Sequence, residues 1–135
     1  MKMFKSSYLR SLCTAVAISA SGQQAYAMQP QQVGNIIYMT GGIGEEERQA
    51  MQSVKNDYNL SLVSADKSGA YVGDTQVVIS DREGKELLNT ESGPLFYAEL
   101  PPGRYVVEGT SQGQTRQQNV TIAEGKPAHV QFSWK

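Results

Sequence analysis

From Leu60 to the C-terminus, short apolar and β-branched runs alternate with turn residues, and this pattern constrains the fold more than any other feature. In several runs the apolar side chains recur at every second position, which is the period of a strand with one buried face. Turn signals rich in Gly, Pro and Asp, such as residues 81–85 and 101–103, separate the runs. We expect seven strands, around residues 60–62, 76–80, 87–88, 95–100, 104–108, 116–122 and 129–134.

Seven short strands with frequent turns predict a mainly β protein built as a sandwich of two sheets. Apolar positions that alternate with polar ones should fill the space between the sheets. Trp134 lies one residue from the end of the sequence, so we expect the last strand to be part of the core. The predicted core consists of Leu60, Leu62, Val77, Ile79, Ala98, Leu100, Tyr105, Val107, Val120, Ile122, Val130, Phe132 and Trp134.

A strand and one helix are expected before the sandwich. Residues 35–39 form a short apolar run of β-type residues, and a glycine-rich turn at 40–44 ends it. Three glutamates at 45–47 suit the positive end of a helix dipole. The spacing of the following apolar residues predicts a helix over roughly residues 44–57. Those apolar residues are Ala50, Met51, Val54 and Tyr58.

The N-terminus has the features of a secretory signal peptide. Basic residues precede an apolar run of about ten residues, which is too short to cross a bilayer as a helix. Ala25 and Ala27 occupy the −3 and −1 positions of a cut between Ala27 and Met28. The predicted organisation is a signal peptide at 1–27, a flexible leader at 28–34, a strand–helix extension at 35–58 and the sandwich at 59–135.

Cleavage of this segment would change the chemistry available to the chain. The full sequence has 12 Lys+Arg and 13 Asp+Glu, and residues 1–27 contain basic residues but no acidic ones. The mature chain is therefore acidic, which argues against a nucleic-acid-binding protein. Cys13 is the only cysteine and would be removed, leaving no thiol for a disulfide, a metal or a nucleophile. We expect a periplasmic protein that does not insert into the membrane after cleavage.

Part of the predicted sandwich resembles a known family. The sequence LPPGRYVV at 100–107 is followed by Gly113, by VTI at 120–122 and by VQF at 130–132. These segments are similar to the carboxypeptidase regulatory-like domain, which has a transthyretin-like (prealbumin-like) fold. The resemblance implies a seven-stranded Greek-key β-sandwich, and it implies a structural or binding module, because a fold of this kind does not itself define an activity.

The extension carries a second resemblance. The sequence GGIGEEER at 41–48, together with YNL at 58–60, is similar to a group of uncharacterised periplasmic bacterial proteins that place a strand and a helix before such a domain. With the sandwich, the resemblance covers about residues 35–135. It implies an exported protein and leaves its activity open.

The motifs that could carry chemistry favour structural roles. The glycine turn at 40–44 lacks the lysine of a phosphate-binding loop and precedes three glutamates that would repel an anion. Successive helical residues point about 100° apart, so the glutamates at 45–47 cannot converge on one cation. His129 is the only histidine, and no G-x-S-x-G sequence accompanies it. We expect no catalytic residue, no metal and no cofactor.

These features favour a non-enzymatic interaction or accessory module for an envelope protein. The helix face is the least generic part of the sequence, and an open strand edge is a second possible contact region. An alternative is a module that binds carbohydrate or a peptidoglycan fragment through stacked aromatic rings. A hydrolase centred on His129 is the least favoured alternative. The candidate partner surface is Glu45, Glu46, Arg48 and Gln49, and the candidate ligand-stacking residues are Tyr38, Tyr71, Phe96 and Tyr97.

Overall fold

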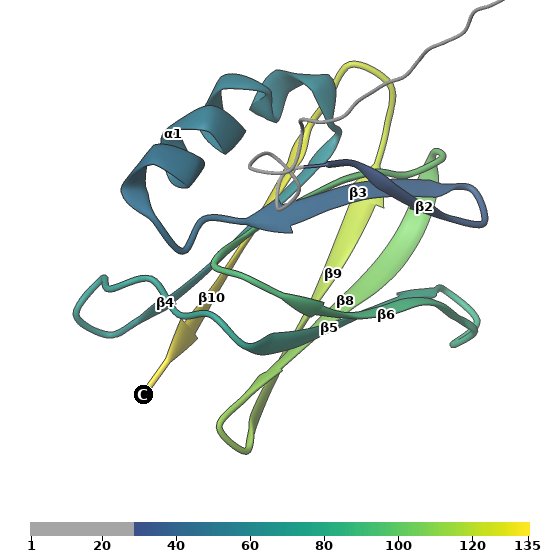
Figure 1. Ribbon diagram of the computed structural model, residues 1–135. Coiled ribbons are helices and arrows are strands. Elements are labelled where there is room, and N and C mark those ends of the chain that lie inside the picture. The colour runs from purple at the N-terminus through teal and green to yellow at the C-terminus, as the bar shows by residue number, and fades with distance from the viewer. Residues whose placement is uncertain (1–28) are drawn as a thin grey trace, which may run out of the picture.

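The computed structural model describes residues 29–135 as two packed β-sheets and one α-helix (Figure 1). The predicted signal peptide and its cut between Ala27 and Met28 lie outside the described residues. Within residues 29–135, no helix has the length and apolar character needed to span a bilayer.

The first sheet has five strands in the order β10-β4-β7-β3-β2. These strands are β2 (Gln31–Val33), β3 (Ile36–Gly41), β4 (Leu60–Asp66), β7 (Leu95–Glu99) and β10 (Ala128–Trp134). Strand β10 is parallel to β4, and the other neighbouring pairs are antiparallel. The second sheet is antiparallel, in the order β6-β5-β8-β9. Its strands are β5 (Thr75–Asp81), β6 (Glu86–Ser92), β8 (Gly103–Ser111) and β9 (Gln114–Ile122).

The mainly β architecture is confirmed, but the described residues form one strand more than expected. Strands β4 to β10 lie in the seven segments predicted for the sandwich, β3 matches the strand expected at 35–39, and β2 is additional. Strand β3 lies beside β7 inside the first sheet, so the strand of the predicted extension is part of the sandwich itself. Strand β2 falls within the range expected to be a flexible leader, where it pairs with the first half of β3. The Greek-key connectivity stays a prediction.

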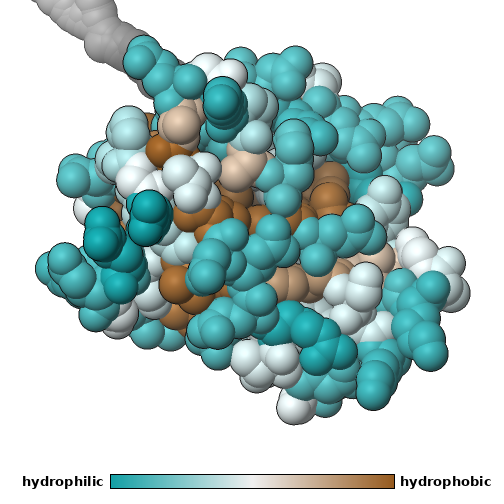
Figure 2. All heavy atoms as spheres, turned by 180° about the vertical axis from the view of Figure 1, so that it is seen from behind, coloured by the Kyte–Doolittle hydropathy of each residue, from teal (hydrophilic) through white to brown (hydrophobic). Residues whose placement is uncertain are grey.

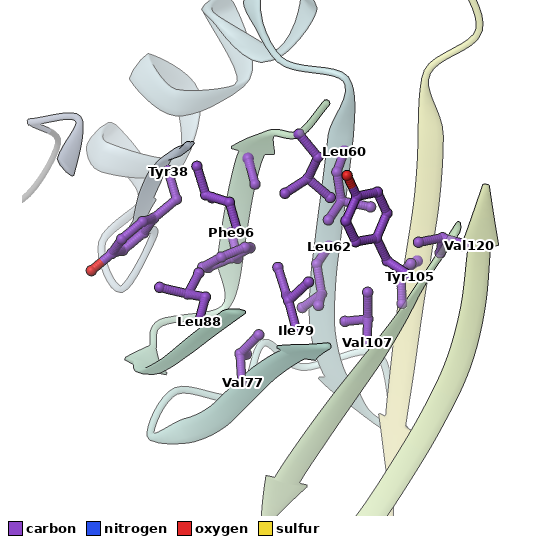
Figure 3. Packing of buried hydrophobic residues seen from close by; sticks show 14 of the residues in the cluster. Tyr38, Leu60, Leu62, Val77, Ile79, Leu88, Phe96, Tyr105, Val107 and Val120 are labelled. Carbon is purple, nitrogen blue, oxygen red and sulfur yellow. The ribbon is translucent and has the colours of Figure 1, made fainter. Parts of the chain in front are cut away.

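The space between the two sheets holds the main core (Figure 3). All thirteen residues predicted for the core are buried there, because the alternation places every second side chain of each strand on the inner face. Strand β3 adds Ile36 and Tyr38, and the Tyr38 ring stacks on Phe96 with centroids 5.6 Å apart. Seen from behind, apolar atoms form a band framed by polar side chains (Figure 2).

A second, smaller cluster lies on the outer face of the five-stranded sheet, beneath the helix. Met51 of α1 (Glu45–Ser53) is fully buried in the same cluster as Met39, Leu95 and Tyr97. The helix is shorter than the predicted 44–57, because it ends at Ser53 and the separate 3₁₀ turn η2 (Lys55–Asp57) follows. Asn and Asp compete for backbone hydrogen bonds and so favour such breaks. The break lets Tyr58 pack against Tyr97, with ring centroids 6.0 Å apart.

The last strand gives a direct test of this core. Trp134 is buried near Phe132, and its Nε1 atom has no hydrogen-bond partner within the described chain. We expect Trp134→Ala to lower the free energy of unfolding by about 3–5 kcal/mol, because it removes a large buried ring. Trp134→Phe should cost much less, since it loses no hydrogen bond. Urea unfolding measures both; an alanine variant as stable as the parent would contradict the packing.

Candidate functional site

The loop between β3 and α1 is held from one side by the carboxylate of Glu47. Glu47 Oε1 accepts a hydrogen bond from the Gly42 amide at 2.7 Å and another from the Ile43 amide at 3.2 Å. These amides lie just before the helix, where backbone donors otherwise lack partners. Gly42 has φ of +100°, and a Cβ atom there would come within 3.0 Å of Leu95 Cγ. The tight turn therefore requires glycine at this position.

Arg48 holds the same loop from the other side. Its Nη1 atom donates to the Gly42 carbonyl at 3.1 Å and to the Ile43 carbonyl at 3.2 Å. The guanidinium carbon also lies 4.5 Å from the centre of the Tyr71 ring, which is within the range of a cation–π interaction. We call these contacts of Glu47 and Arg48 with the loop the loop clamp. It fixes the backbone on both sides of Ile43.

The loop clamp presents two apolar side chains to solvent. Ile43 is 70% exposed and Tyr71 is 44% exposed. A Cβ atom on Gly73 would lie 3.0 Å from Ile43 Cδ1, so the isoleucine side chain reaches the segment that carries Tyr71. Arg48 contacts both sides, because it binds the Ile43 carbonyl and covers the Tyr71 ring. We call the surface of Ile43, Arg48 and Tyr71 the tip surface.

Tyr71 is positioned by a turn after β4. Asp66 Oδ1 accepts hydrogen bonds from the Ser68 amide at 2.9 Å, the Ser68 hydroxyl at 2.6 Å and the Ala70 amide at 3.1 Å. Tyr71 then forms an antiparallel bridge with Ala65. The pKa of Asp66 is lowered, mainly because its carboxylate accepts a hydrogen bond from the Ser68 hydroxyl. Desolvation opposes this effect, and backbone hydrogen bonds, including that of the Ala70 amide, lower the pKa further.

The predicted partner surface is only partly free. Glu45, Glu46 and Gln49 are exposed on α1, and Gln49 Nε2 lies 3.5 Å from Glu45 Oε2. Arg48 is half-buried, and its guanidinium is engaged by the loop and by Tyr71. Glu45 and Glu46 therefore lie beside the tip surface as solvated negative charges. Whether these residues contact a partner stays a prediction.

The predicted stacking residues do not form an exposed platform. Tyr38, Phe96 and Tyr97 are buried, with exposed fractions of 7%, 0% and 2%, and only Tyr71 is exposed. Phe96 and Tyr97 are neighbours on β7, so their side chains point to opposite faces of the sheet. Phe96 does point into the main core, but Tyr97 points to the outer face, which α1 covers. A sugar-binding platform made of these four rings is therefore not present.

Glu47 already accepts the hydrogen bonds of the Gly42 and Ile43 amides, so these two loop donors are not available to a phosphate. The neighbouring glutamates do not converge, and residues 29–135 contain no group of three His, Cys, Asp or Glu side chains placed to hold a metal ion.

His129 makes one notable contact. Its Nδ1 atom lies 2.6 Å from Ser61 Oγ, across the paired strands β10 and β4. A catalytic triad also requires an acid that orients the histidine. No carboxylate of the described residues is hydrogen-bonded to His129, and Ser61 is buried. This pair is a cross-strand hydrogen bond without the third member of a triad.

Comparisons with known proteins identify no family for this chain. No protein-family model matches the sequence. No curated protein matches it either. Among solved structures, it is similar to the major pilin subunit BcpA of Bacillus cereus, with 16% identity, a TM-score of 0.40 and coverage of 55% of this chain and 27% of that one. A variant of that subunit gives 14% identity, a TM-score of 0.42 and coverage of 55% and 28%.

This chain thus spans a little over a quarter of the length of those pilin subunits. A likeness of this extent carries no argument about function. The description of the fold rests instead on the strand pairing within this chain.

Sequence reasoning missed Glu47 and Ile43. The available signal was an isoleucine between glycines, where a polar turn residue is usual, with a glutamate at the third helical position. The contact between Arg48 and Tyr71 had no local signal, because the two residues are far apart in the sequence.

The loop clamp predicts a difference between two neighbouring glutamates. Glu47→Ala leaves the Gly42 and Ile43 amides without their acceptor, so the free energy of unfolding should fall by about 1–3 kcal/mol. Glu46→Ala is the matched control, because that side chain is exposed, and it should change stability by less than about 0.5 kcal/mol. Guanidinium unfolding of both variants measures the difference. Equal stabilities would show that the clamp contributes nothing.

The turn that carries Tyr71 should respond to acid. The folded pKa of Asp66 is lowered, so its hydrogen bonds to Ser68 and Ala70 persist above the ordinary value of 3.8 and are lost as the pH falls through the lowered pKa. NMR titration should give an Asp66 midpoint below 3.8, with the Ser68 and Ala70 amide signals moving together. A midpoint at or above 3.8 would contradict this geometry.

Proposed function

We propose that this chain is an exported, non-enzymatic β-sandwich that acts as an interaction module for a protein of the cell envelope. The observation that carries the proposal is the tip surface, where a rigidly held loop exposes Ile43 beside Tyr71. The basic and apolar segments of residues 1–27 support export to the periplasm. The resemblance of residues 100–107 to carboxypeptidase regulatory-like domains supports a binding role over an enzymatic one.

The tip surface has the composition of a binding hot spot. Tyr and Arg are enriched among residues that contribute most to protein interfaces, and an adjacent aliphatic side chain adds apolar area. Burying the exposed part of Ile43 and Tyr71 against a partner would remove that area from water. Because the loop clamp already fixes the backbone, binding would cost little conformational entropy.

The charges around the tip surface suggest the chemistry of the partner. Glu45 and Glu46 are exposed next to Ile43. Arg48 is half-buried, and its Nη1 atom already donates to two loop carbonyls. A partner should therefore offer an apolar pocket flanked by Lys or Arg side chains. Such complementarity mainly accelerates association and selects the correct partner. The binding should weaken as the salt concentration rises.

Carbohydrate or peptidoglycan binding is the alternative, but it has lost most of its support. Three of its four stacking residues are buried, and a single exposed ring at Tyr71 makes no platform. A hydrolase centred on His129 is supported only by the contact with Ser61.

Site-specific photocrosslinking in living cells tests the proposal. A photoreactive residue at position 45 should capture one envelope protein, and Ile43→Ser should abolish that capture by removing the apolar anchor. Val33→Ser is the matched control, because Val33 is another exposed aliphatic side chain (44%) but lies on the edge strand β2. Two outcomes would contradict the tip surface as the binding site. One is that the Ile43→Ser variant still captures the protein, and the other is that Val33→Ser abolishes capture as completely as Ile43→Ser does.

The same experiment reports on export. Mass spectrometry of the crosslinked product from the periplasmic fraction should find a mature chain that begins at Met28. A product that retains residues 1–27, or that remains in the cytoplasm, would overturn the proposed location.

A further inference from the structure

A pocket of about 780 Å³ lies at the end of the molecule remote from the tip surface. Turns between successive elements form its walls: the segment from η2 to β4, the turn from β7 to β8 and the turn from β9 to β10. The loop clamp is at the start of α1, whereas the pocket adjoins η2 beyond the helix end. The volume lies within the range of about 300–1,000 Å³ that is typical of small-molecule sites.

Asn59 makes one wall of the pocket rigid. Its Oδ1 atom accepts from the Leu100 amide at 2.9 Å, and its Nδ2 atom donates to the Leu100 carbonyl at 2.8 Å. The same Nδ2 also donates to Oε2 of Glu99, a lining residue, at 3.3 Å. Tyr105 donates to the Pro101 carbonyl at 2.6 Å, which fixes the adjoining turn. The pocket is therefore preformed, and a ligand would not have to order it.

The pocket combines an apolar surface with an excess of negative charge. Prolines at 101, 102 and 127 line it together with Leu100 and Ile122. The carboxylates are Asp57, Glu99 and Glu124, and the only cationic side chain in the lining is Lys126.

The negative charges of the pocket also affect the Tyr58 phenol. Burial is the main reason that its pKa is raised, and the charges of Asp57 and Glu99 raise it further. Both carboxylates therefore act on the same part of the pocket, and Tyr58 stays a neutral hydroxyl that can donate or accept a hydrogen bond.

We propose that this pocket binds a small aliphatic amine, with an ammonium group facing Glu99 and Asp57 and its methylene chain lying on the prolines. An ammonium donates three hydrogen bonds and matches the charge excess, whereas an anion would be repelled. The methylenes would gain from the apolar lining. This inference is independent of the tip surface, because it uses none of its residues.

Spermidine is the probe that tests the site. Titration into the ¹⁵N-labelled mature protein should shift the amide signals of Tyr58, Asn59 and Lys126 and leave that of Ile43 unchanged. The double variant Asp57→Asn/Glu99→Gln should weaken the fitted affinity by about tenfold or more, since each carboxylate contributes a charge-assisted contact. Glu83→Gln/Glu86→Gln is the matched control, because it removes the same charge from the exposed hairpin between β5 and β6 and should leave the affinity within about twofold.

Three results would overturn the proposal. They are the absence of shifts with spermidine at millimolar concentration, equal weakening by the two double variants, and shifts at the pocket with neutral N-acetylglucosamine but not with spermidine. The last result would identify a glycan site. The Ile43→Ser variant should bind spermidine as the parent does, so failure of either proposal can be told apart from failure of the other.

Discussion

The structure depends on the fact that strand β7 is buried on both of its faces. Phe96 and Ala98 point into the space between the sheets, and Leu95 and Tyr97 point to the outer face. An apolar outer face must be covered, and α1 covers it through Met51.

The chain must therefore reverse direction sharply between β3 and α1. That reversal requires Gly42 at positive φ and partners for the exposed loop backbone, which Glu47 and Arg48 supply. The exposure of Ile43 follows from the same geometry, because the side chain lies at the outside of this turn.

Much of the sandwich could be predicted from the sequence, because in most strands only one face is apolar. Short apolar runs, alternating in several cases, and the turn signals between them located the segments of β4 to β10 and all thirteen residues assigned to the core. The same reasoning failed at β7, whose sequence LFYAE lacks alternation. A short unbroken apolar run is the signal of a strand buried on both faces, and it would have removed Phe96 and Tyr97 from the candidate ligand-binding residues.

Strand β2 was missed because Gln31 and Gln32 are polar and its pairing depends on β3. The loop clamp was missed because hydrogen bonds to a loop backbone depend on the loop conformation, which no residue pattern defines.

The two surfaces proposed for binding differ in chemistry and lie beyond opposite ends of the helix. The tip surface exposes two apolar side chains beside an arginine that is hydrogen-bonded to the loop, and its neighbours Glu45 and Glu46 are exposed to solvent. The pocket is a preformed concavity in which carboxylates outnumber cationic groups. Both are positioned by short turns anchored to rigid strands, through Glu47 and Arg48 in one case and Asn59 in the other. The two proposed interactions do not exclude each other, since no residue is shared between the two surfaces.

Amide hydrogen exchange at Gly42 and Ile43 tests the central claim most directly. If the helix over β7 fixes the loop and Glu47 binds its amides, both should exchange at least about tenfold more slowly than the unstructured chain, although Ile43 is largely exposed. The amide of Gly44, for which no acceptor is found among the described residues, provides an internal reference. Exchange of the Gly42 and Ile43 amides at the rate of an unstructured peptide would show that the loop is not held, and the account of the tip surface would then be wrong.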